Sequence, residues 1–378
     1  MRPPTPLPAI FDGRDLSVAA DSFRVALLVP MCGAAGIWGP SCIASAQLAV
    51  RELNAADGIK GRPVELIMID SAIEAKTPTE VLVGSLIAMG VIDAVVGMHI
   101  SAVHQRLLKT VRSRVPYVYT PLYEGGERTP GVFAIGDTPD MQLGPAIEWL
   151  HQKYRHRKWG LVGNDYIWPR ISNIYAKRKI AALGGEIAYE RYLPFGSESL
   201  EDEVLRVAES GAEAVLMTLI GQDAVDFNRA FGHAAMDRRM IRLSCVLEEN
   251  CVLACGADSL RRMYSAASYF GALQTDENTA FKERYFALHG DRAPMLNSIG
   301  QSLYEGFHFL HSLLDTQGEA WAVLTSSAGR SGTYKSARRK ASAQSQHALA
   351  SHTDMYLARA DGIGFEIISR LSPDRPRN

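Results

Sequence analysis

The sequence predicts an α/β protein made of two doubly wound, Rossmann-like lobes, each with a mostly parallel sheet covered by helices. Three observations favour this fold class. The chain has 378 residues, which is too long for one ordinary hydrophobic core. Short apolar segments alternate with amphipathic segments from residue 23 onward, as buried parallel strands alternate with helices. The alternation restarts near residue 140, and two consecutive units of about 120 residues imply two similar lobes.

The first unit opens with the apolar segment 23–30, FRVALLVP, which ends in the glycine-rich turn CGAAGIWGP. An amphipathic segment then runs to Asn54, and Pro40 stands where a first helical turn tolerates proline. The same patterns predict the remaining elements of this unit. The expected strands are 64–70, 91–97 and 115–120, and the expected helices are 77–89 and 101–112.

The second unit repeats this order of elements, and a third, shorter run follows it. The helices expected in the second unit are 140–154, 171–183, 199–210 and 222–234, and the strands are 159–163, 186–193, 214–219 and 241–246. A strand at 264–270 and helices at 278–289 and 298–315 come next, and then two β segments at 332–340 and 354–368. An Asp-Gly pair within the last segment suits a hairpin turn.

These patterns predict the domain organisation. We expect an N-terminal extension at 1–22, one lobe made of 23–137 and 266–330, and a second lobe made of 138–265 and 331–378. A chain that passes between lobes more than once couples them through several connections.

The charge balance argues against nucleic acid as a direct partner. Lys and Arg number 40 and Asp and Glu 41, whereas phosphate binding needs a basic surplus. The basic cluster Arg338-Arg339-Lys340 is expected to be a solvated loop or strand edge. The five cysteines form no regular framework, so we expect neither a disulfide scaffold nor a metal site, and no cofactor.

The N-terminal sequence bears on localisation. Residues 1–22 lack the basic start, apolar stretch and small-residue cleavage site of a secretory signal. The sequence as written therefore predicts a cytoplasmic protein. A misassigned start codon or a trimmed sequence would instead allow a periplasmic one.

Candidate ligand-binding residues follow from the expected sheet topology. In an open α/β sheet, ligands bind beyond the carboxyl ends of the strands, in loops that lead into helices. Aromatic and hydroxyl-bearing residues dominate these loops, which suits a mostly apolar pocket for a small polar organic ligand. The candidates are Trp38, Ser101, Ala102, Tyr119, Thr120, Tyr166, Trp168, Thr218, Cys245, Glu248 and Tyr269. Each has an alternative role: the aromatics could be core residues, and Ser101 could cap its helix.

Enzymatic alternatives find little support in the sequence. Gly33, Gly36 and Gly39 follow the first strand, but their GxxGxxG spacing differs from the GxGxxG fingerprint of NAD-dependent dehydrogenases. Such a dehydrogenase is a distant alternative. There is no GxSxG, P-loop or HExxH motif, so we expect no enzyme.

Several motifs resemble one subgroup of the type I periplasmic binding proteins. They are YTPLYEG at 119–125, GDTPD at 136–140, GNDYIWPR at 163–170, GIKGRPVEL at 58–66 and LNSIGQSLYEGF at 296–307. The subgroup comprises the substrate-binding components of urea and short-chain-amide ABC transporters and the cytosolic amide sensor of the aliphatic amidase operon. The resemblance covers most of the chain, and GNDYIWPR is its most specific part.

The resemblance implies roles for particular residues. Ser101 and Tyr119 would contact the ligand from the first lobe, and the aromatic pair Tyr166 and Trp168 would fold over it from the second. The sequence departs from the subgroup at Cys245, where members have a hydroxyl-bearing residue, and at Pro121, where the amide sensor has a threonine. Near the C-terminus, Gln346-His347 stands where members have Asn-His.

Two functions fit a protein whose lobes close on a ligand by hinge motion. In the first, the chain is a cytosolic amide-type sensor, and a regulator protein binds one of its two states. In the second, the chain is the binding component of an ABC transporter for branched-chain amino acids, urea or short-chain amides. The permease recognises its closed state and takes the ligand. The missing export signal favours the sensor, and either form could act as a homodimer.

Overall fold

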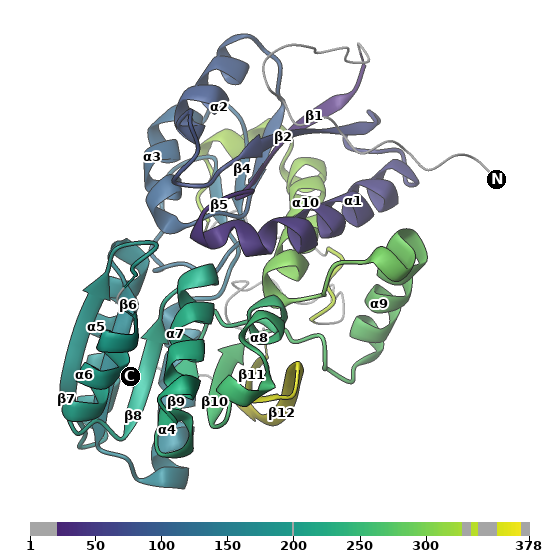
Figure 1. Cartoon of the computed structure of the whole chain (residues 1–378). Helices are drawn as coiled ribbons and strands as arrows, with labels where there is room; N and C mark the ends of the chain where they lie inside the picture. Colours follow the sequence, from purple (N-terminus) through teal and green to yellow (C-terminus); the bar gives the residue numbers. More distant parts are fainter. Residues whose placement is uncertain (1–20, 199, 327–333, 339–353, 372–378) are drawn as a thin grey trace.

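The computed structural model describes residues 21–198, 200–326, 334–338 and 354–371. The N-terminal residues 1–20, Arg339-Lys340 and Gln346-His347 lie outside these ranges. The described chain forms two α/β lobes, one above the other in Figure 1, and the predicted fold class is confirmed.

The sheet of the first lobe has the strand order β2-β1-β3-β4-β5, with every neighbouring pair parallel. Its strands are β1 Phe23–Val29, β2 Val64–Asp70, β3 Ala94–Gly97, β4 Tyr117–Tyr119 and β5 Val132–Ala134. All but parts of β1 and β2 are fully buried, as expected for a sheet with helices on both faces.

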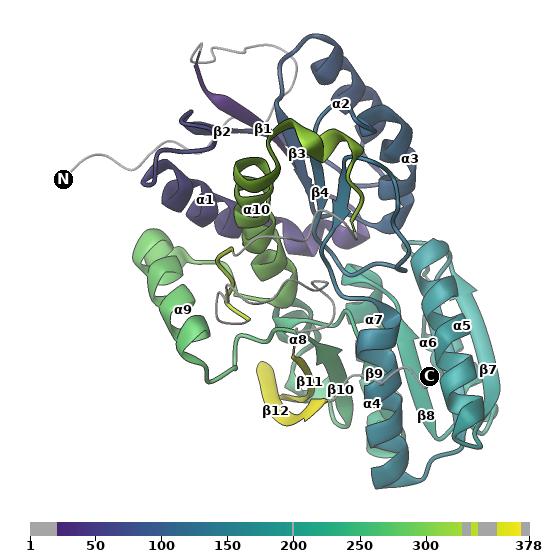
Figure 2. The ribbon, with the colours of Figure 1, turned by 180° about the vertical axis from the view of Figure 1, so that it is seen from behind.

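The helices of this lobe form two groups. They are α1 Gly39–Asn54, α2 Thr79–Ala88, α3 Ser101–Val111, α9 Asp276–His289 and α10 Ser298–Gln317, with a 3₁₀ turn, η1, at Ala34–Trp38 and another, η5, at Gly318–Val323. Helices α1, α9 and α10 pack together, and α2 packs on α3 (Figure 2). The long helix α10 is buried along most of its length, because it lies between α1 and strands β3 and β4.

The second sheet has the order β12-β11-β10-β9-β8-β6-β7. Its strands are β6 Lys158–Asn164, β7 Glu186–Leu193, β8 Ala214–Thr218, β9 Ile241–Ser244, β10 Met263–Ala267, β11 Met355–Asp361 and β12 Gly364–Leu371. Strands β11 and β12 form the expected hairpin and add to the edge of β10 in antiparallel register. The other pairs are parallel.

Helices cover both faces of this second sheet. They are α4 Pro139–Tyr154, α5 Ile167–Ala182, α6 Leu200–Glu209, α7 Gly221–His233 and α8 Glu249–Cys255. Helices α4 and α5 pack together, while α6, α7 and α8 form the other layer.

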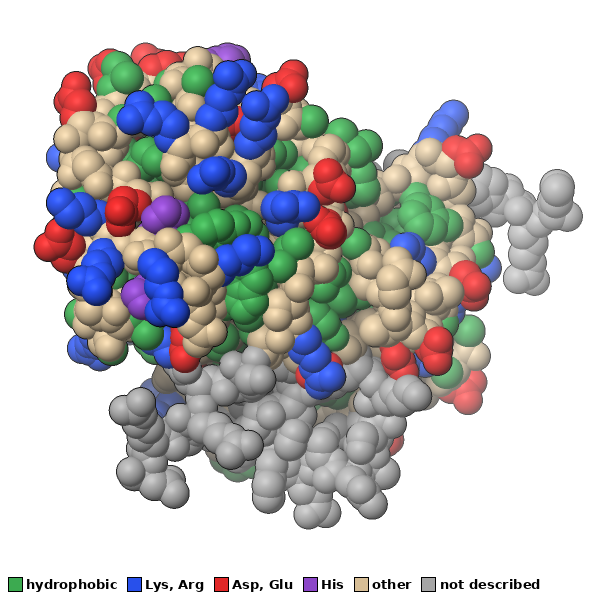
Figure 3. Space-filling view, turned by 90° about the horizontal axis from the view of Figure 1, so that it is seen from below, with side chains coloured by type: hydrophobic (Ala, Val, Ile, Leu, Met, Phe, Trp, Pro, Cys, Tyr) green, Lys and Arg blue, Asp and Glu red, His purple; other side chains and the backbone are tan. Residues whose placement is uncertain are grey.

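On the face that Figure 3 shows, basic and acidic side chains are interspersed, with hydrophobic side chains between them.

Some expectations about single elements are wrong. Helix α5 begins at Ile167 rather than 171, because Tyr166 has an extended backbone and Pro169 is accommodated in the first helical turn. Residues 334–338 form no strand. Arg338 is not solvated but buried, because two buried carboxylates pair with its guanidinium. Strand β5 and helix α8 were not expected at all.

In the part of the chain that the structure describes, no helix combines the length and apolar character needed to span a bilayer. The described cysteines are all free, and four of the five are buried.

Candidate functional site

The two lobes touch where η1 of the first lobe meets α7 and α8 of the second. Gly221, the first residue of α7, has a φ of +50°, and a Cβ there would lie 1.9 Å from the carbonyl oxygen of Ala34. Asn250 Nδ2 of α8 donates to Ser41 Oγ of α1 at 3.4 Å. The described conformation therefore has the lobes in direct contact on this side.

The first lobe brings Ser101 and Tyr119 together. Strand β4 ends at Tyr119, and its hydroxyl donates to the carbonyl oxygen of His99 at 2.9 Å. Ser101 Oγ lies 3.5 Å from the same hydroxyl. Ile100 is the N-cap of α3, so the alternative role of Ser101 as a helix cap is wrong. Burial raises the pKa of Tyr119 far above its usual value, so its hydroxyl stays neutral.

The hydroxyl groups of Thr120 and Thr218 are already used within the protein. Thr120 Oγ1 donates to the Gly97 carbonyl at 3.2 Å, and Thr218 Oγ1 donates to Asn173 Oδ1 at 3.2 Å. A threonine hydroxyl has a single proton to donate. In this conformation, therefore, each could offer a ligand only an acceptor lone pair.

The second lobe contributes the aromatic pair at the start of α5. The ring centroids of Tyr166 and Trp168 are 6.3 Å apart, and Phe195 lies 5.4 Å from Tyr166. Trp168 is only 2% exposed, and its indole N–H has no hydrogen-bond partner among the described residues. Burial raises the pKa of Tyr166, and the neighbouring Tyr119 of the first lobe raises it further. Helix α5, which follows Tyr166, also contacts α3 of the first lobe.

Trp38 and Glu248 form a second contact region across the boundary. Glu248 caps α8, because its carboxylate accepts from Asn250 N at 2.8 Å and from Cys251 N at 3.2 Å. Burial raises its pKa to about 7, although these bonds and the nearby indole of Trp38 oppose the rise. The indole N–H of Trp38 still lacks a partner with normal hydrogen-bond geometry.

Glu249 adds a second buried carboxyl to this region. Its Oε1 accepts from Gly271 N at 2.7 Å, whereas its Oε2 has no described partner. Burial raises its pKa to about 8, and the charge of Glu248 adds to the rise. A buried, incompletely paired carboxyl is costly unless it is protonated or meets a donor.

The remaining candidates have different environments. Ala102 is half-buried at the second position of α3. Cys245 is buried after β9, and burial, with a smaller effect of Asp137, raises the pKa of its thiol. Burial, and then the charge of the nearby Glu249, raises the pKa of Tyr269. Its hydroxyl donates to Asn278 Oδ1 at 2.8 Å and its ring meets the edge of Phe281, both on α9.

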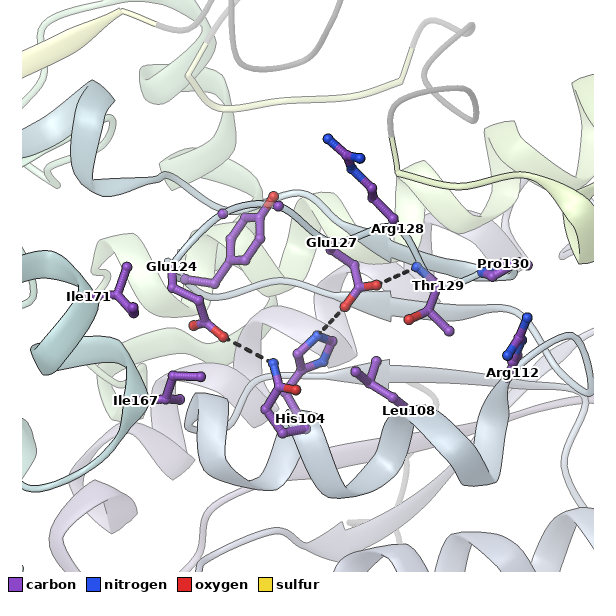
Figure 4. A pocket seen from close by; sticks show the side chains of 14 residues that line it. His104, Leu108, Arg112, Glu124, Glu127, Arg128, Thr129, Pro130, Ile167 and Ile171 are labelled. Carbon is purple, nitrogen blue, oxygen red and sulfur yellow. Dashed lines mark hydrogen bonds and ion pairs between the residues drawn. The ribbon is translucent and has the colours of Figure 1, made fainter. Parts of the chain in front are cut away.

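A cavity of about 580 Å³ lies beside these residues and is lined by none of the predicted ones. Helix α3 and the loop 123–130 of the first lobe form most of its wall, and Ile167 and Ile171 of α5 face them from the second lobe (Figure 4). At its floor His104 Nε2 lies 2.8 Å from Glu127 Oε2. Gln105 and Glu124 also line the cavity, and Gln105 Nε2 donates to Glu124 Oε1 at 3.1 Å. The cavity therefore lies between the two lobes, beside the contact of α3 with α5.

Gln142 supports the site in a way that sequence reasoning missed. Its Nε2 donates to the carbonyl oxygens of Cys245 and Ala266, each at 3.2 Å, and so ties α4 to the ends of β9 and β10. The sequence does not indicate this role for Gln142, because the two acceptors are more than 100 residues away in the chain.

The chain belongs to the periplasmic binding protein family, because the sequence model of that family matches residues 22–364. This is a family of ligand binders that are not enzymes.

Solved structures of ABC transporter components share the fold. A solute-binding protein from R. palustris in complex with 4-hydroxybenzoate has a TM-score of 0.78 at 16% identity and covers 94% of this chain and 98% of its own. A periplasmic binding protein from Burkholderia mallei has a TM-score of 0.76 at 16% identity, covering 94% and 96%. A branched-chain amino acid transporter's periplasmic ligand-binding protein from Burkholderia xenovorans has a TM-score of 0.72 at 16% identity, covering 93% and 96%.

Proposed function

We propose that this chain is the substrate-binding component of an ABC transporter and closes on a small amide-, urea- or amino-acid-like ligand. The observation that carries the proposal is that candidate residues of both lobes lie along one boundary. Helix α3, which begins at Ser101, contacts α5, which carries Trp168. The turn η1, which ends at Trp38, contacts α8, which Glu248 caps. Contacts that exist only when the lobes meet are the ones by which a ligand would stabilise the closed state.

The polar groups at this boundary favour a ligand without net negative charge. The candidate residues include no Lys or Arg, and the ionisable groups beside Trp38 are the carboxyls of Glu248 and Glu249. A benzoate-type ligand would bring a negative charge that no cation among the candidate residues offsets. An amide or urea N–H, or an ammonium group, would instead donate to them. The aromatic rings would cover the apolar part of such a ligand.

The transport role is supported by the structural relatives, whose names place them in ABC transporters. A cytosolic amide-type sensor would close in the same way, and a regulator protein would recognise one of its two states. The preference for that function over transport rested on the N-terminal sequence alone, and we therefore propose the transport role in its place.

A thermal-shift screen tests the binding part of the proposal. The compounds are acetamide, urea, leucine and 4-hydroxybenzoate. A ligand present at 100 times its Kd stabilises the folded protein by about 2.7 kcal/mol, which raises Tm measurably. We expect a rise with one of the first three compounds. A rise with 4-hydroxybenzoate alone would show that the proposed ligand class is wrong.

Variants locate the site within the same screen. Tyr166→Ala and Trp168→Ala should lose most of the ligand-induced shift. The matched control is Trp149→Ala, since Trp149 is a half-buried tryptophan of the same lobe that packs on Tyr264 instead. An unchanged shift in both site variants would mean that the ligand binds elsewhere.

The transport part has a separate test. Deleting the gene should abolish cellular uptake of the radiolabelled compound that gives the shift. If uptake is normal and expression of an amidase changes instead, the sensor function is correct and the transport role is wrong.

A further inference from the structure

One buried arginine connects the three places where the chain passes between the lobes. Asp137 lies between β5 and α4, Ser268 follows β10, and Arg338 lies between η5 and β11. Arg338 Nη1 donates to Ser268 Oγ at 2.7 Å and lies 3.4 Å from Asp137 Oδ1. Ser268 donates from N and Oγ to Asp137 Oδ2 at 3.2 and 2.7 Å. All three crossovers therefore meet at a single guanidinium.

Glu305 on α10 fixes the orientation of this guanidinium. Arg338 Nε donates to Glu305 Oε1 and Oε2 at 3.1 and 3.0 Å, and Nη2 donates to Oε2. The side chain of Glu305 is fully buried and that of Arg338 is 4% exposed. Burial alone would lower the pKa of Arg338, but Glu305 and Asp137 raise it above its ordinary value. A bidentate pair of this kind is strong and directional.

The network also reaches the candidate site. Gln301 Nε2 donates to Glu305 Oε1 at 2.8 Å, one turn earlier on α10. The adjoining Ser302 donates from Oγ to the carbonyl oxygen of Thr120 at 2.5 Å, at the end of β4. A shift of α10 would therefore be transmitted to the strand end that carries Tyr119 and Thr120.

We infer that Arg338 is a positioning residue for lobe closure, which pins the three crossovers so that the lobes rotate about one pivot and do not slide or separate. Hinge motion needs a few fixed positions that absorb the rotation, and these crossovers supply them. Without Arg338, two buried carboxylates would lose their counterion and repel each other. The inference rests on the closure that the proposed function uses, but it does not depend on which ligand binds.

The test measures the distance between the lobes in the absence of any ligand. Spin labels are attached at Met89→Cys on the first lobe and Leu205→Cys on the second, in a Cys32→Ser background, because these three positions are exposed and the other cysteines are buried. Pulsed electron spin resonance then gives the distribution of interlobe distances. We expect a narrow distribution for the parent protein and one about twofold broader for Arg338→Met, because the pivot is lost.

Lys335→Met is the matched control. Lys335 is a cation of the same short segment, but its side chain is 59% exposed and pairs with Glu52 on α1 rather than with the crossovers. Its removal should leave the distribution narrow. Arg338→Lys should give an intermediate width, because a lysine keeps the charge but cannot form the bidentate pair.

A folded Arg338→Met variant with the parental distribution would overturn the inference. If that variant does not fold, Ser268→Ala decides the matter, since it removes the hydroxyl between Arg338 and Asp137 and leaves every charge in place. Ser268→Ala should broaden the distribution, and a narrow one would refute the pivot. If the protein bound none of the screened compounds, the interlobe distances of these variants would not change. The proposed function and the role of Arg338 can therefore be refuted separately.

Discussion

At the scale of single residues, Glu248 and Glu249 near the lobe boundary are unusually weak acids. Burial raises their pKa values to about 7 and about 8, well above that of an exposed glutamate. The folded protein therefore holds protons that the unfolded chain has already released near neutral pH. Stability from such groups is complete below the unfolded pKa and is lost as pH rises through the folded one.

The first prediction concerns this pH window. The free energy of unfolding should fall as the pH rises from about 5 to about 8, because each glutamate must lose its proton in a buried site. Chemical denaturation at pH 5, 6, 7 and 8 measures it. Glu249→Gln should flatten the decline, whereas Glu366→Gln should not, since Glu366 is an exposed partner of Arg359. Equal slopes in all three proteins would contradict the assignment.

Residues of the candidate site were predictable where a motif carried them. The GNDYIWPR run placed Tyr166 and Trp168, and strand ends placed Ser101 and Tyr119. Tyr269 also stood near a strand end, yet its hydroxyl bonds to Asn278. Which way a buried tyrosine turns depends on its tertiary neighbours, which the sequence does not specify.

At the scale of elements, helix α5 presents an apolar stripe to the first lobe. Ile167, Ile171 and Ile174 are each more than a third exposed and follow the spacing of one helical face. The first two line the cavity beside α3 and loop 123–130, while Ile174 does not (Figure 4). Tighter closure would bury the first two against the opposite wall.

The second prediction compares Ile171, which lines the cavity, with Ile174, which does not. Ile171→Asp should weaken binding of the compound found in the screen by about tenfold, because closure would desolvate an unpaired carboxylate. Ile174→Asp should bind normally, since its carboxylate stays in water. Titration calorimetry measures both affinities. Equal affinities for the two variants would show that this side of the boundary does not close on ligand.

The strands were predicted better than the ends of the helices. Residues 64–70 and 186–193 form strands with the expected bounds, because most residues of each segment are apolar or aromatic and turns flank both. Strand β5 has only three residues, and α8 has seven, so neither has enough length for a period to show.

At the scale of the whole molecule, contact between the lobes depends on how closely their backbones approach. Gly221 and Gly211 both have positive φ values, of 50° and 75°. A Cβ at Gly221 would meet the Ala34 carbonyl across the boundary, whereas a Cβ at Gly211 would have no atom within 4 Å. The two positions share the backbone strain and differ only in the interlobe contact.

The third prediction follows from this comparison. Gly221→Ala and Gly211→Ala should each lose about 1 kcal/mol of stability from left-handed strain. Only Gly221→Ala should also lose most of the ligand-induced rise in Tm, because the added methyl group holds the lobes apart. A parental ligand-induced rise in Gly221→Ala would contradict the described closed contact.

The two-lobed architecture could be predicted because the repeated alternation of strands and helices is a local signal. The Arg338 network could not, and the basic cluster at 338–340 was expected to be solvated. Its partners Asp137 and Ser268 lie 201 and 70 residues away, and only the folded crossovers bring them together. Long-range ion pairs of this kind leave no periodic pattern in the sequence.

The central claim is that one small ligand is held between the two lobes. The most direct measurement is a crystal structure of the protein with the compound that gives the largest thermal shift. We expect density for that compound between Tyr119 of the first lobe and Trp168 of the second. Density that contacts residues of one lobe only would contradict the claim.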